Sequence, residues 1–195
     1  MPSYKLTYFD FKGRGEIMRY IFAYTNTPYE DIRIQFSEWP AHKASFPFGK
    51  LPVLEIDGVV YSQSLAISRY LAKQSGLAGK TPLDDLHIDI VIDHLDDLVA
   101  LFPWLTDDNE KRKEYMDKNA PAVLGGLEKS LGNNKFFAGD YVTWADFFWD
   151  NCYDMFEHYI PGFANAYPKL LAVRKRVHEI PAIAAWIKKR PVTDI

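Results

Sequence analysis

The sequence predicts an α/β domain followed by an all-α domain in a chain of 195 residues. Strand and helix patterns alternate in the first part, and after Lys80 only helical spacing appears. The pattern changes at the segment GLAGKTP, residues 76–82, and no internal repeat interrupts either part. We therefore expect one domain over residues 1–79 and a second over residues 80–195.

The first elements predict a parallel βαβ unit. Residues 4–9, YKLTYF, alternate and are rich in β-formers, which predicts a strand. Residues 15–25, GEIMRYIFAYT, place apolar side chains at helical spacing, and Asn26-Thr27-Pro28 ends that helix. Residues 29–34, YEDIRI, predict the second strand, so that strand, helix and strand follow one another.

A hairpin and then only helices are expected after this unit. Residues 51–62 place two β-rich runs around Asp57-Gly58, a dipeptide typical of tight hairpin turns. Residues 63–76 have helical spacing and end near Gly76, which completes a sheet domain of about four strands. Helical spacing then predicts helices over residues 83–102, 109–131, 144–159, 167–177 and 181–189.

The composition is that of an ordinary globular protein. Apolar residues make up 48% of the chain, and the net charge of −3 gives no case for nucleic-acid binding. Cys152 is the one cysteine, which excludes an internal disulfide framework and a CxxC redox or zinc motif. The first residues, MPSYKLTYFD, contain no apolar signal-peptide core, and no run reaches membrane-spanning length. We expect a cytoplasmic protein that does not bind membranes.

Tyr8 and Gly13-Arg14-Gly15 flank the turn between the first strand and the first helix. One interpretation is packing and a helix start; the other is an anionic group bound between the phenol and the guanidinium. The Gly-x-Gly pattern also suggests dinucleotide binding, but Met18 stands where the third glycine belongs. We therefore set nucleotide binding aside.

Two stretches beside the hairpin are candidates for binding. Pro52 stands at the mouth of a strand, where proline is tolerated. A cis Leu51-Pro52 bond, a minority form in general, would turn the backbone of residues 49–51 outward to pair with an extended peptide. Ser62-Gln63-Ser64 precedes a helix whose first N–H groups are a potential anion site, and ordinary N-capping by Ser62 is the alternative.

An acidic helix face is the next candidate. Asp89, Asp93, Asp96 and Asp97 lie along one face of the helix that begins near residue 83. This face is either solvated or a subunit interface that holds a hard divalent cation through carboxylates and water. We expect His94 at the surface or at an interface.

Aromatic residues of the second half belong either to the core or to the wall of an apolar pocket. These are Phe102 and Trp104 on one side, and Phe148, Trp149 and Cys152 on another helix. A different local signal is structural: Thr143 and Asp146 fit a capping box at a helix start.

Taken together, these stretches resemble the sigma class of glutathione transferases. The resemblance rests on MPSYKLTYF, GRGE, WPxxK at Trp39 and Lys43, PFGKLPVLEIDG, SQSLAISRYL, FPW, VTWADF and KKRPVTDI, in order along the whole chain. Within the class the chain is most similar to the haematopoietic prostaglandin D synthases. The resemblance implies a thioredoxin-like N-terminal domain that binds glutathione and a helical C-terminal domain, the glutathione transferase fold.

The resemblance also implies roles for individual residues. Tyr8 and Arg14 would be catalytic, with the Tyr8 hydroxyl stabilising the glutathione thiolate. The glutathione site would contain Tyr8, Arg14, Trp39, Lys43, Gly49, Lys50, Leu51, Pro52, Gln63, Ser64 and, from the other subunit of a homodimer, Asp97. The electrophile pocket would contain Phe9, Gly13, Arg14, Trp104, Phe148, Cys152 and Ile195. The family's cis-proline implies a cis bond before Pro52.

The implied activity is attack of the glutathione thiolate on an electrophile, with glutathione-dependent peroxide reduction as a side activity. A narrower alternative is isomerisation of prostaglandin H2 to prostaglandin D2, and a further one is a crystallin-like structural protein. Asp93, Asp96 and Asp97 match a cluster that binds Mg²⁺ or Ca²⁺ at the dimer interface. Phe148 stands where tyrosine is expected, and the loop after Trp104 is several residues shorter.

Overall fold

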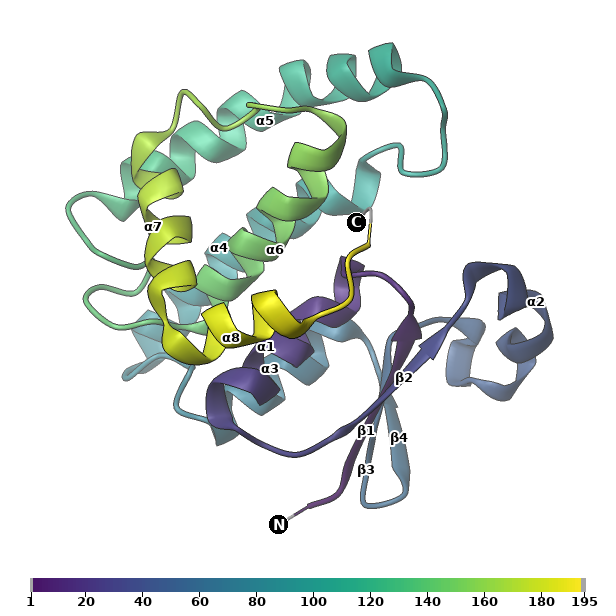
Figure 1. Cartoon of the computed structure of the whole chain (residues 1–195). Helices are drawn as coiled ribbons and strands as arrows, with labels where there is room; N and C mark the ends of the chain where they lie inside the picture. Colours follow the sequence, from purple (N-terminus) through teal and green to yellow (C-terminus); the bar gives the residue numbers. More distant parts are fainter. Residues whose placement is uncertain (1, 194–195) are drawn as a thin grey trace. The chain divides into compact units, whose positions relative to one another are not determined.

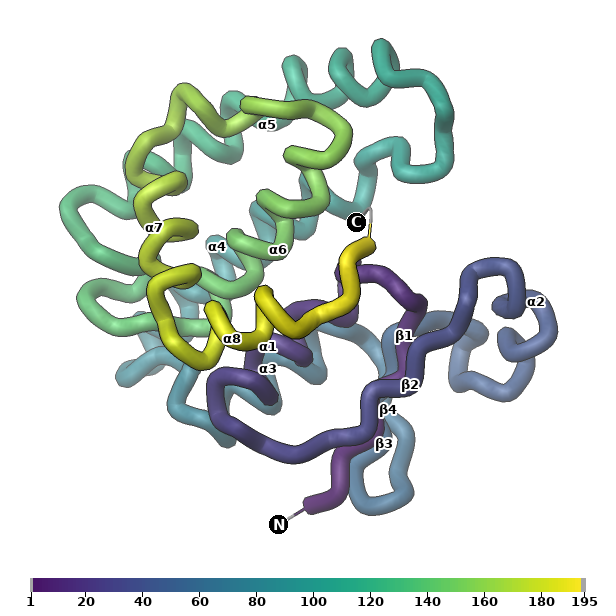
Figure 2. The backbone as a smooth tube through the Cα atoms, viewed as in Figure 1, coloured from purple at the N-terminus to yellow at the C-terminus, as the bar shows by residue number. Residues whose placement is uncertain are grey.

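The computed structural model describes residues 2–193, which fall into two compact units (Figure 1). The first unit contains the residues up to Ser75 together with those from Pro181 onward, and the second contains Gly76–Ile180. Contacts thus group the helix that begins at Pro181 with the start of the chain. In Figure 2 this helix, in yellow, lies beside the purple N-terminal segment. The division into domains 1–79 and 80–195 rests on the sequence pattern and stays a prediction.

The first unit is built on a sheet with the strand order β2-β1-β3-β4. Its strands are β1 (Tyr4–Phe9), β2 (Glu30–Ile34), β3 (Val53–Ile56) and β4 (Val59–Ser62). β1 and β2 are parallel, whereas β3 pairs antiparallel with both β1 and β4. The predicted βαβ unit and the predicted hairpin are both confirmed.

Helix α1 (Glu16–Thr25) is the central helix of the first unit. It packs against α3 (Ser64–Gln74) and against α8 (Pro181–Lys189), on one side of the sheet in Figure 1. Its apolar side chains, among them Ile17 and Ile21, are buried because their spacing places them on the faces that meet the sheet and the other helices. The short α2 (Trp39–His42) and several 3₁₀ turns occupy the irregular stretch between β2 and β3.

The second unit is helical, as predicted. It contains α4 (Pro82–Leu101), α5 (Asn109–Leu131), α6 (Trp144–Tyr159) and α7 (Pro168–Glu179). Helix α6 packs against both α4 and α7, and its residues from Trp144 to Cys152 are all buried. Within residues 2–193, no helix has the length and apolar character needed to span a membrane.

The predicted capping box at the start of α6 is confirmed. The Asp146 carboxylate accepts hydrogen bonds from the Thr143 N–H at 2.7 Å, the Thr143 hydroxyl at 3.0 Å and the Phe137 N–H at 2.9 Å. Asp146 is fully buried, and burial raises its pKa to about 6 although these donors oppose the rise. The box therefore joins the helix start to the loop before it inside the core.

Candidate functional site

Tyr8 lies at the end of β1, directly against the glycine-rich turn that opens α1. Its hydroxyl oxygen accepts a hydrogen bond from the Arg14 backbone N–H at 3.1 Å. A Cβ atom on Gly13 would lie 2.7 Å from this oxygen, and one on Gly15 would lie 2.5 Å from Tyr8 Cδ1. The two glycines are therefore needed because the backbone of the turn passes this close to the phenol ring.

The Tyr8 hydroxyl is suited to donate its proton in a hydrogen bond. Its side chain is buried, and burial raises the pKa of the phenol, against the opposing effects of the Arg14 N–H and the Arg14 and Arg19 charges. The phenol therefore stays protonated at neutral pH. Because the oxygen already accepts from Arg14, the hydroxyl hydrogen remains available for an anionic acceptor.

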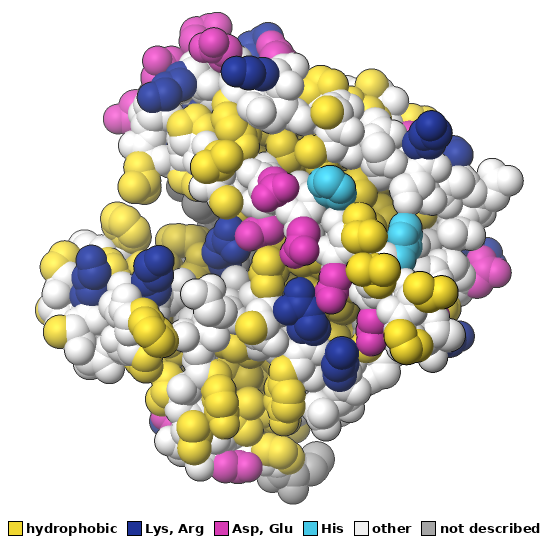
Figure 3. All heavy atoms as spheres, turned by 180° about the vertical axis from the view of Figure 1, so that it is seen from behind, with side chains coloured by type: hydrophobic (Ala, Val, Ile, Leu, Met, Phe, Trp, Pro, Cys, Tyr) yellow, Lys and Arg dark blue, Asp and Glu magenta, His cyan; other side chains and the backbone are white. Residues whose placement is uncertain are grey.

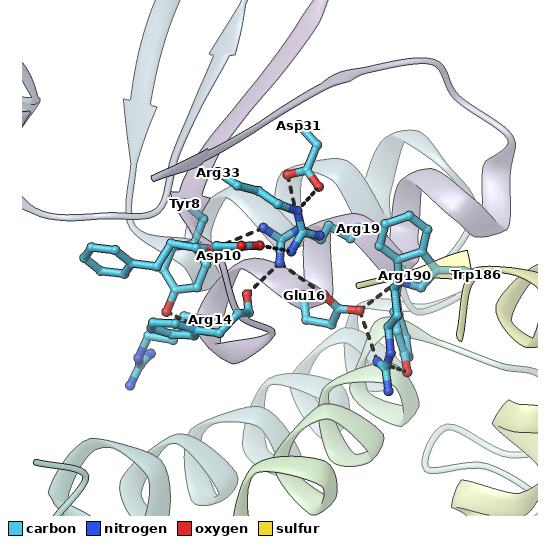
Figure 4. A network of polar contacts seen from close by, with 12 residues as sticks. Tyr8, Asp10, Arg14, Glu16, Arg19, Asp31, Arg33, Trp186 and Arg190 are labelled. Carbon is cyan, nitrogen blue, oxygen red and sulfur yellow. Dashed lines mark hydrogen bonds and ion pairs between the residues drawn. The ribbon is translucent and has the colours of Figure 1, made fainter. Parts of the chain in front are cut away.

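A network of polar contacts surrounds this turn (Figure 4). Arg19 is fully buried and pairs with Glu16 at 3.2 Å and with Asp31 at 3.2 Å. Asp31 also pairs with Arg33 at 2.9 Å. No sequence motif marks these residues as a group, although the spacing of Glu16 and Arg19, three apart on one helix, is typical of an ion pair.

The stretch from Trp39 to Pro52 contributes the next candidates. The Trp39 ring packs edge-on against Phe9, with ring centroids 5.4 Å apart. The Lys43 side chain passes Gly49, where an added Cβ would lie 3.4 Å from it, and Lys43 and Lys50 are both exposed. The Leu51-Pro52 peptide bond is cis, as the resemblance implies.

Helix α3 begins at Ser64 with Gln63 in the N-cap position. Gln63 has φ of 78° and ψ of 99°, a conformation that is rare for residues other than glycine. The Gln63 side chain makes no capping hydrogen bond, and because Gln63 holds the N-cap position, the alternative in which Ser62 is the N-cap is wrong. The first-turn N–H groups of α3 thus have no acceptor in the N-cap side chain and are available to an anion.

In the helical unit, Trp104 belongs to an aromatic cluster. Its indole N–H donates to the Val99 carbonyl at 2.7 Å, and its ring stacks on Phe156 at 5.6 Å. Trp104 is half-buried, whereas Phe148 and Cys152 on α6 are almost fully buried. Ile195, the remaining pocket candidate, lies outside the described residues.

The acidic candidates lie on α4. Asp93, His94 and Asp97 are exposed, and Asp96 is half-buried. Figure 3 shows acidic side chains, histidines and hydrophobic side chains together on one face of the helical unit. No group of three or more His, Cys, Asp or Glu side chains within residues 2–193 is arranged to hold a metal ion. Within one chain, Asp93, Asp96 and Asp97 therefore do not fit a metal site.

Comparison with known proteins agrees with these features. The family model "Glutathione S-transferase, N-terminal domain" matches residues 4–73, and "Glutathione S-transferase, C-terminal domain" matches residues 96–190. The chain is 51% identical to the hematopoietic prostaglandin D synthase of Gallus gallus and 44% identical to that of Homo sapiens, over the full length of each. It is 40% identical to glutathione S-transferase S1 of Drosophila melanogaster, covering 99% of this chain and 81% of that protein.

A solved structure of a relative has the same fold. The structure of rat hPGDS complexed with a quinoline matches with a TM-score of 0.93 and 47% identity, covering 99% of this chain and 100% of that one. The expected architecture, a thioredoxin-like sheet unit and a helical unit, is thereby confirmed. By these matches over nearly its whole length, the chain belongs to the glutathione S-transferase family.

Proposed function

We propose that the chain activates glutathione through the Tyr8 hydroxyl. The observation that carries this proposal is the position of that hydroxyl, which accepts from the Arg14 N–H and keeps its own proton for the glutathione sulfur. A hydrogen bond to a charged group contributes about 1.5–3 kcal/mol, and one pKa unit corresponds to about 1.4 kcal/mol. One such bond would lower the thiol pKa by about one or two units, so that much of the bound thiol would ionise near neutral pH.

The rest of glutathione would lie along the first unit. Its γ-glutamyl carboxylate would accept hydrogen bonds at the start of α3, from Gln63 and Ser64. The backbone of Gly49, Lys50 and Leu51 would pair with the cysteinyl main chain, while Trp39 and Lys43 would hold the glycyl end. Support comes from the start of α3, where the Gln63 side chain makes no capping hydrogen bond.

The thiolate would then attack an electrophile. From the resemblance we assign electrophile binding to Phe9, Gly13, Arg14, Trp104, Phe148 and Cys152, with Ile195 outside the described residues. The proposed products are glutathione conjugates, and peroxide reduction is the proposed side activity.

A second candidate function is isomerisation of prostaglandin H2 to prostaglandin D2. It is favoured by the 51% identity to the prostaglandin D synthase of Gallus gallus over the full length. In this reaction the thiolate would attack an endoperoxide oxygen, and glutathione would be regenerated. Phe148 provides no hydroxyl in place of the tyrosine expected there.

We further propose a homodimer in which Asp97 of one chain reaches the γ-glutamyl amine held by the other. A divalent cation at Asp93, Asp96 and Asp97 would need carboxylates from both chains, and it stays a prediction together with the cytoplasmic location. No step of the proposed reaction requires this cation.

The decisive assay gives purified protein and glutathione either prostaglandin H2 or a chloronitrobenzene. Selective formation of prostaglandin D2 would establish the synthase, and conjugation alone would leave a general transferase. Neither activity, despite glutathione binding, would contradict the proposed catalysis and favour the crystallin-like alternative.

A further inference from the structure

Glu16 and Arg19 form a buried ion pair beside Tyr8, and no role in glutathione binding explains it. Their side chains are 1% and 0% exposed, and Arg19 Nη1 lies 3.2 Å from Glu16 Oε2. Replacing a buried ion pair by apolar residues of similar size is often neutral or stabilising. Stability alone therefore does not account for the two charges at this place in the fold.

The guanidinium of Arg19 holds the backbone that follows Tyr8. Arg19 Nη1 donates to the Phe11 carbonyl at 2.8 Å, and Nη2 donates to the Phe9 carbonyl at 3.5 Å. The guanidinium carbon lies 5.9 Å from the centroid of the Tyr8 ring. Arg19 thus holds the backbone that leads from Tyr8 to the 3₁₀ turn Gly13–Gly15, where an added Cβ on either glycine would meet the Tyr8 side chain.

The carboxylate of Glu16 joins Arg19 to helix α8 (Figure 4). While one oxygen pairs with Arg19, Oε1 accepts from the Trp186 indole N–H at 2.7 Å and from Arg190 Nη1 at 3.1 Å. Arg190 also donates to the Tyr20 hydroxyl at 3.2 Å. Direct contacts thus lead from α8 through Glu16 and Arg19 to the carbonyls beside Tyr8.

We propose that Arg19 is a positioning residue for the Tyr8 hydroxyl, and that Glu16 makes this position depend on the docking of helix α8. The proposal rests on the proposed function of Tyr8. Hydrogen bonds weaken steeply when the donor moves or tilts, so a small displacement of the turn would weaken the bond to sulfur. The C-terminal helix would in this way help to set how readily the bound thiol ionises.

Other charges near Arg19 are part of the same arrangement. Arg19 Nε donates to Asp31 Oδ1, and Arg33 lies between Asp31 and Asp10, at 2.9 and 3.2 Å from them. Opposite charges therefore alternate from Glu16 to Asp10. Because Arg19 already has two carboxylate partners, its charge does not require a bound anion for compensation.

The test uses two variants and one control. Trp186→Phe removes the N–H group that donates a hydrogen bond to Glu16 but keeps an aromatic ring. Arg19→Lys keeps the positive charge but loses the planar guanidinium that donates to the carbonyls of both Phe9 and Phe11. Lys188→Ala, at an exposed position on α8, is the control. The pH profile of kcat/KM is measured with glutathione and a chloronitrobenzene, and glutathione affinity is measured by calorimetry.

We expect the pH profile of kcat/KM to move to higher pH because the bound thiol would ionise less readily. The shift should be about half a pH unit in Trp186→Phe and about one pH unit in Arg19→Lys. Below the apparent pKa, kcat/KM would fall about threefold and about tenfold, respectively. Glutathione affinity would stay within about twofold, and Lys188→Ala would match the unaltered chain. If Arg19→Lys fails to fold, Trp186→Phe decides.

An unchanged profile in Trp186→Phe would overturn the role of α8, even if its thermal unfolding temperature falls. Tyr8→Phe separates this failure from failure of the proposed function. If Tyr8→Phe retains full turnover, the function proposed for Tyr8 is wrong. If Tyr8→Phe loses turnover while Trp186→Phe and Arg19→Lys keep the original pH profile of kcat/KM, the function of Tyr8 stands and only the positioning role of Arg19 and Glu16 is refuted.

Discussion

Gly15→Ala should displace the Tyr8 ring without straining the backbone dihedral angles of position 15 itself. Gly15 has φ of −83° and ψ of −25°, which alanine adopts freely, so the added methyl group is the main new feature. That Cβ would lie 2.5 Å from Tyr8 Cδ1 and 2.7 Å from Cγ, whereas carbon atoms in contact prefer about 3.5–4.0 Å. The ring must therefore retreat by about 1 Å.

Two magnitudes follow from this clash. Overpacking costs about 1–3 kcal/mol, partly offset by the gain of about 0.5–1 kcal/mol when alanine replaces a helical glycine. We expect a net loss of up to about 2.5 kcal/mol in the free energy of unfolding. A displacement of about 1 Å at a reacting group can reduce turnover on the order of a hundredfold, with a much smaller effect on glutathione affinity.

The matched control is Gly125→Ala in α5, where the nearest atom to an added Cβ is Tyr167 Cε1 at an ordinary 3.9 Å. This variant should be as stable as the unaltered chain or slightly more so, with full turnover. Urea unfolding and steady-state conjugation kinetics measure both effects. If Gly15→Ala keeps full turnover, the position of the Tyr8 ring does not limit the reaction.

Three further predictions concern other residues. Tyr8→Phe should keep glutathione affinity, measured by calorimetry, and lose most turnover, because the ring remains while the donor to sulfur is removed; unchanged turnover would exclude Tyr8 from the mechanism. Asp97→Ala should weaken glutathione binding in the dimer, and an unaltered dissociation constant would argue against a site shared between subunits. For Asp146, the native pKa of about 6 exceeds the unfolded value of about 3.9. The native state then binds more protons between these values, so this residue's contribution to stability is complete below about pH 4. It should fall by up to roughly 3 kcal/mol as the pH rises to about 6. Urea unfolding of the unaltered chain and of Asp146→Asn, measured across this pH range, gives the difference between their free energies of unfolding. A difference that does not change with pH would contradict the prediction.

Local patterns in the sequence determine much of the fold. The helix predicted over residues 109–131 is α5 itself, and the hairpin turns at Asp57-Gly58, because periodicity and turn residues act over short distances. The capping box of Thr143 and Asp146 was predictable for the same reason.

Features that depend on long-range contacts were not predictable from local pattern. A positive φ at Gln63 contradicts the preference of its residue type, so the sequence left N-capping by Ser62 open as an alternative. The pair Glu16 and Arg19 has a recognisable spacing, but nothing near it in sequence indicates Trp186 and Arg190 as partners. The roles of most site residues came from the resemblance to a family. The sequence pattern by itself left several of these residues with two interpretations.

The grouping of α8 with the first unit has a consequence for synthesis on the ribosome. Residues 76–180 form a continuous unit that can fold once it has emerged, whereas the first unit lacks α8 until Pro181–Lys189 have been synthesised. Until then, Glu16 Oε1 lacks Trp186 and Arg190, its partners from the far end of the chain. Of these two units, the sheet unit, although its synthesis begins first, is therefore completed after the helical one.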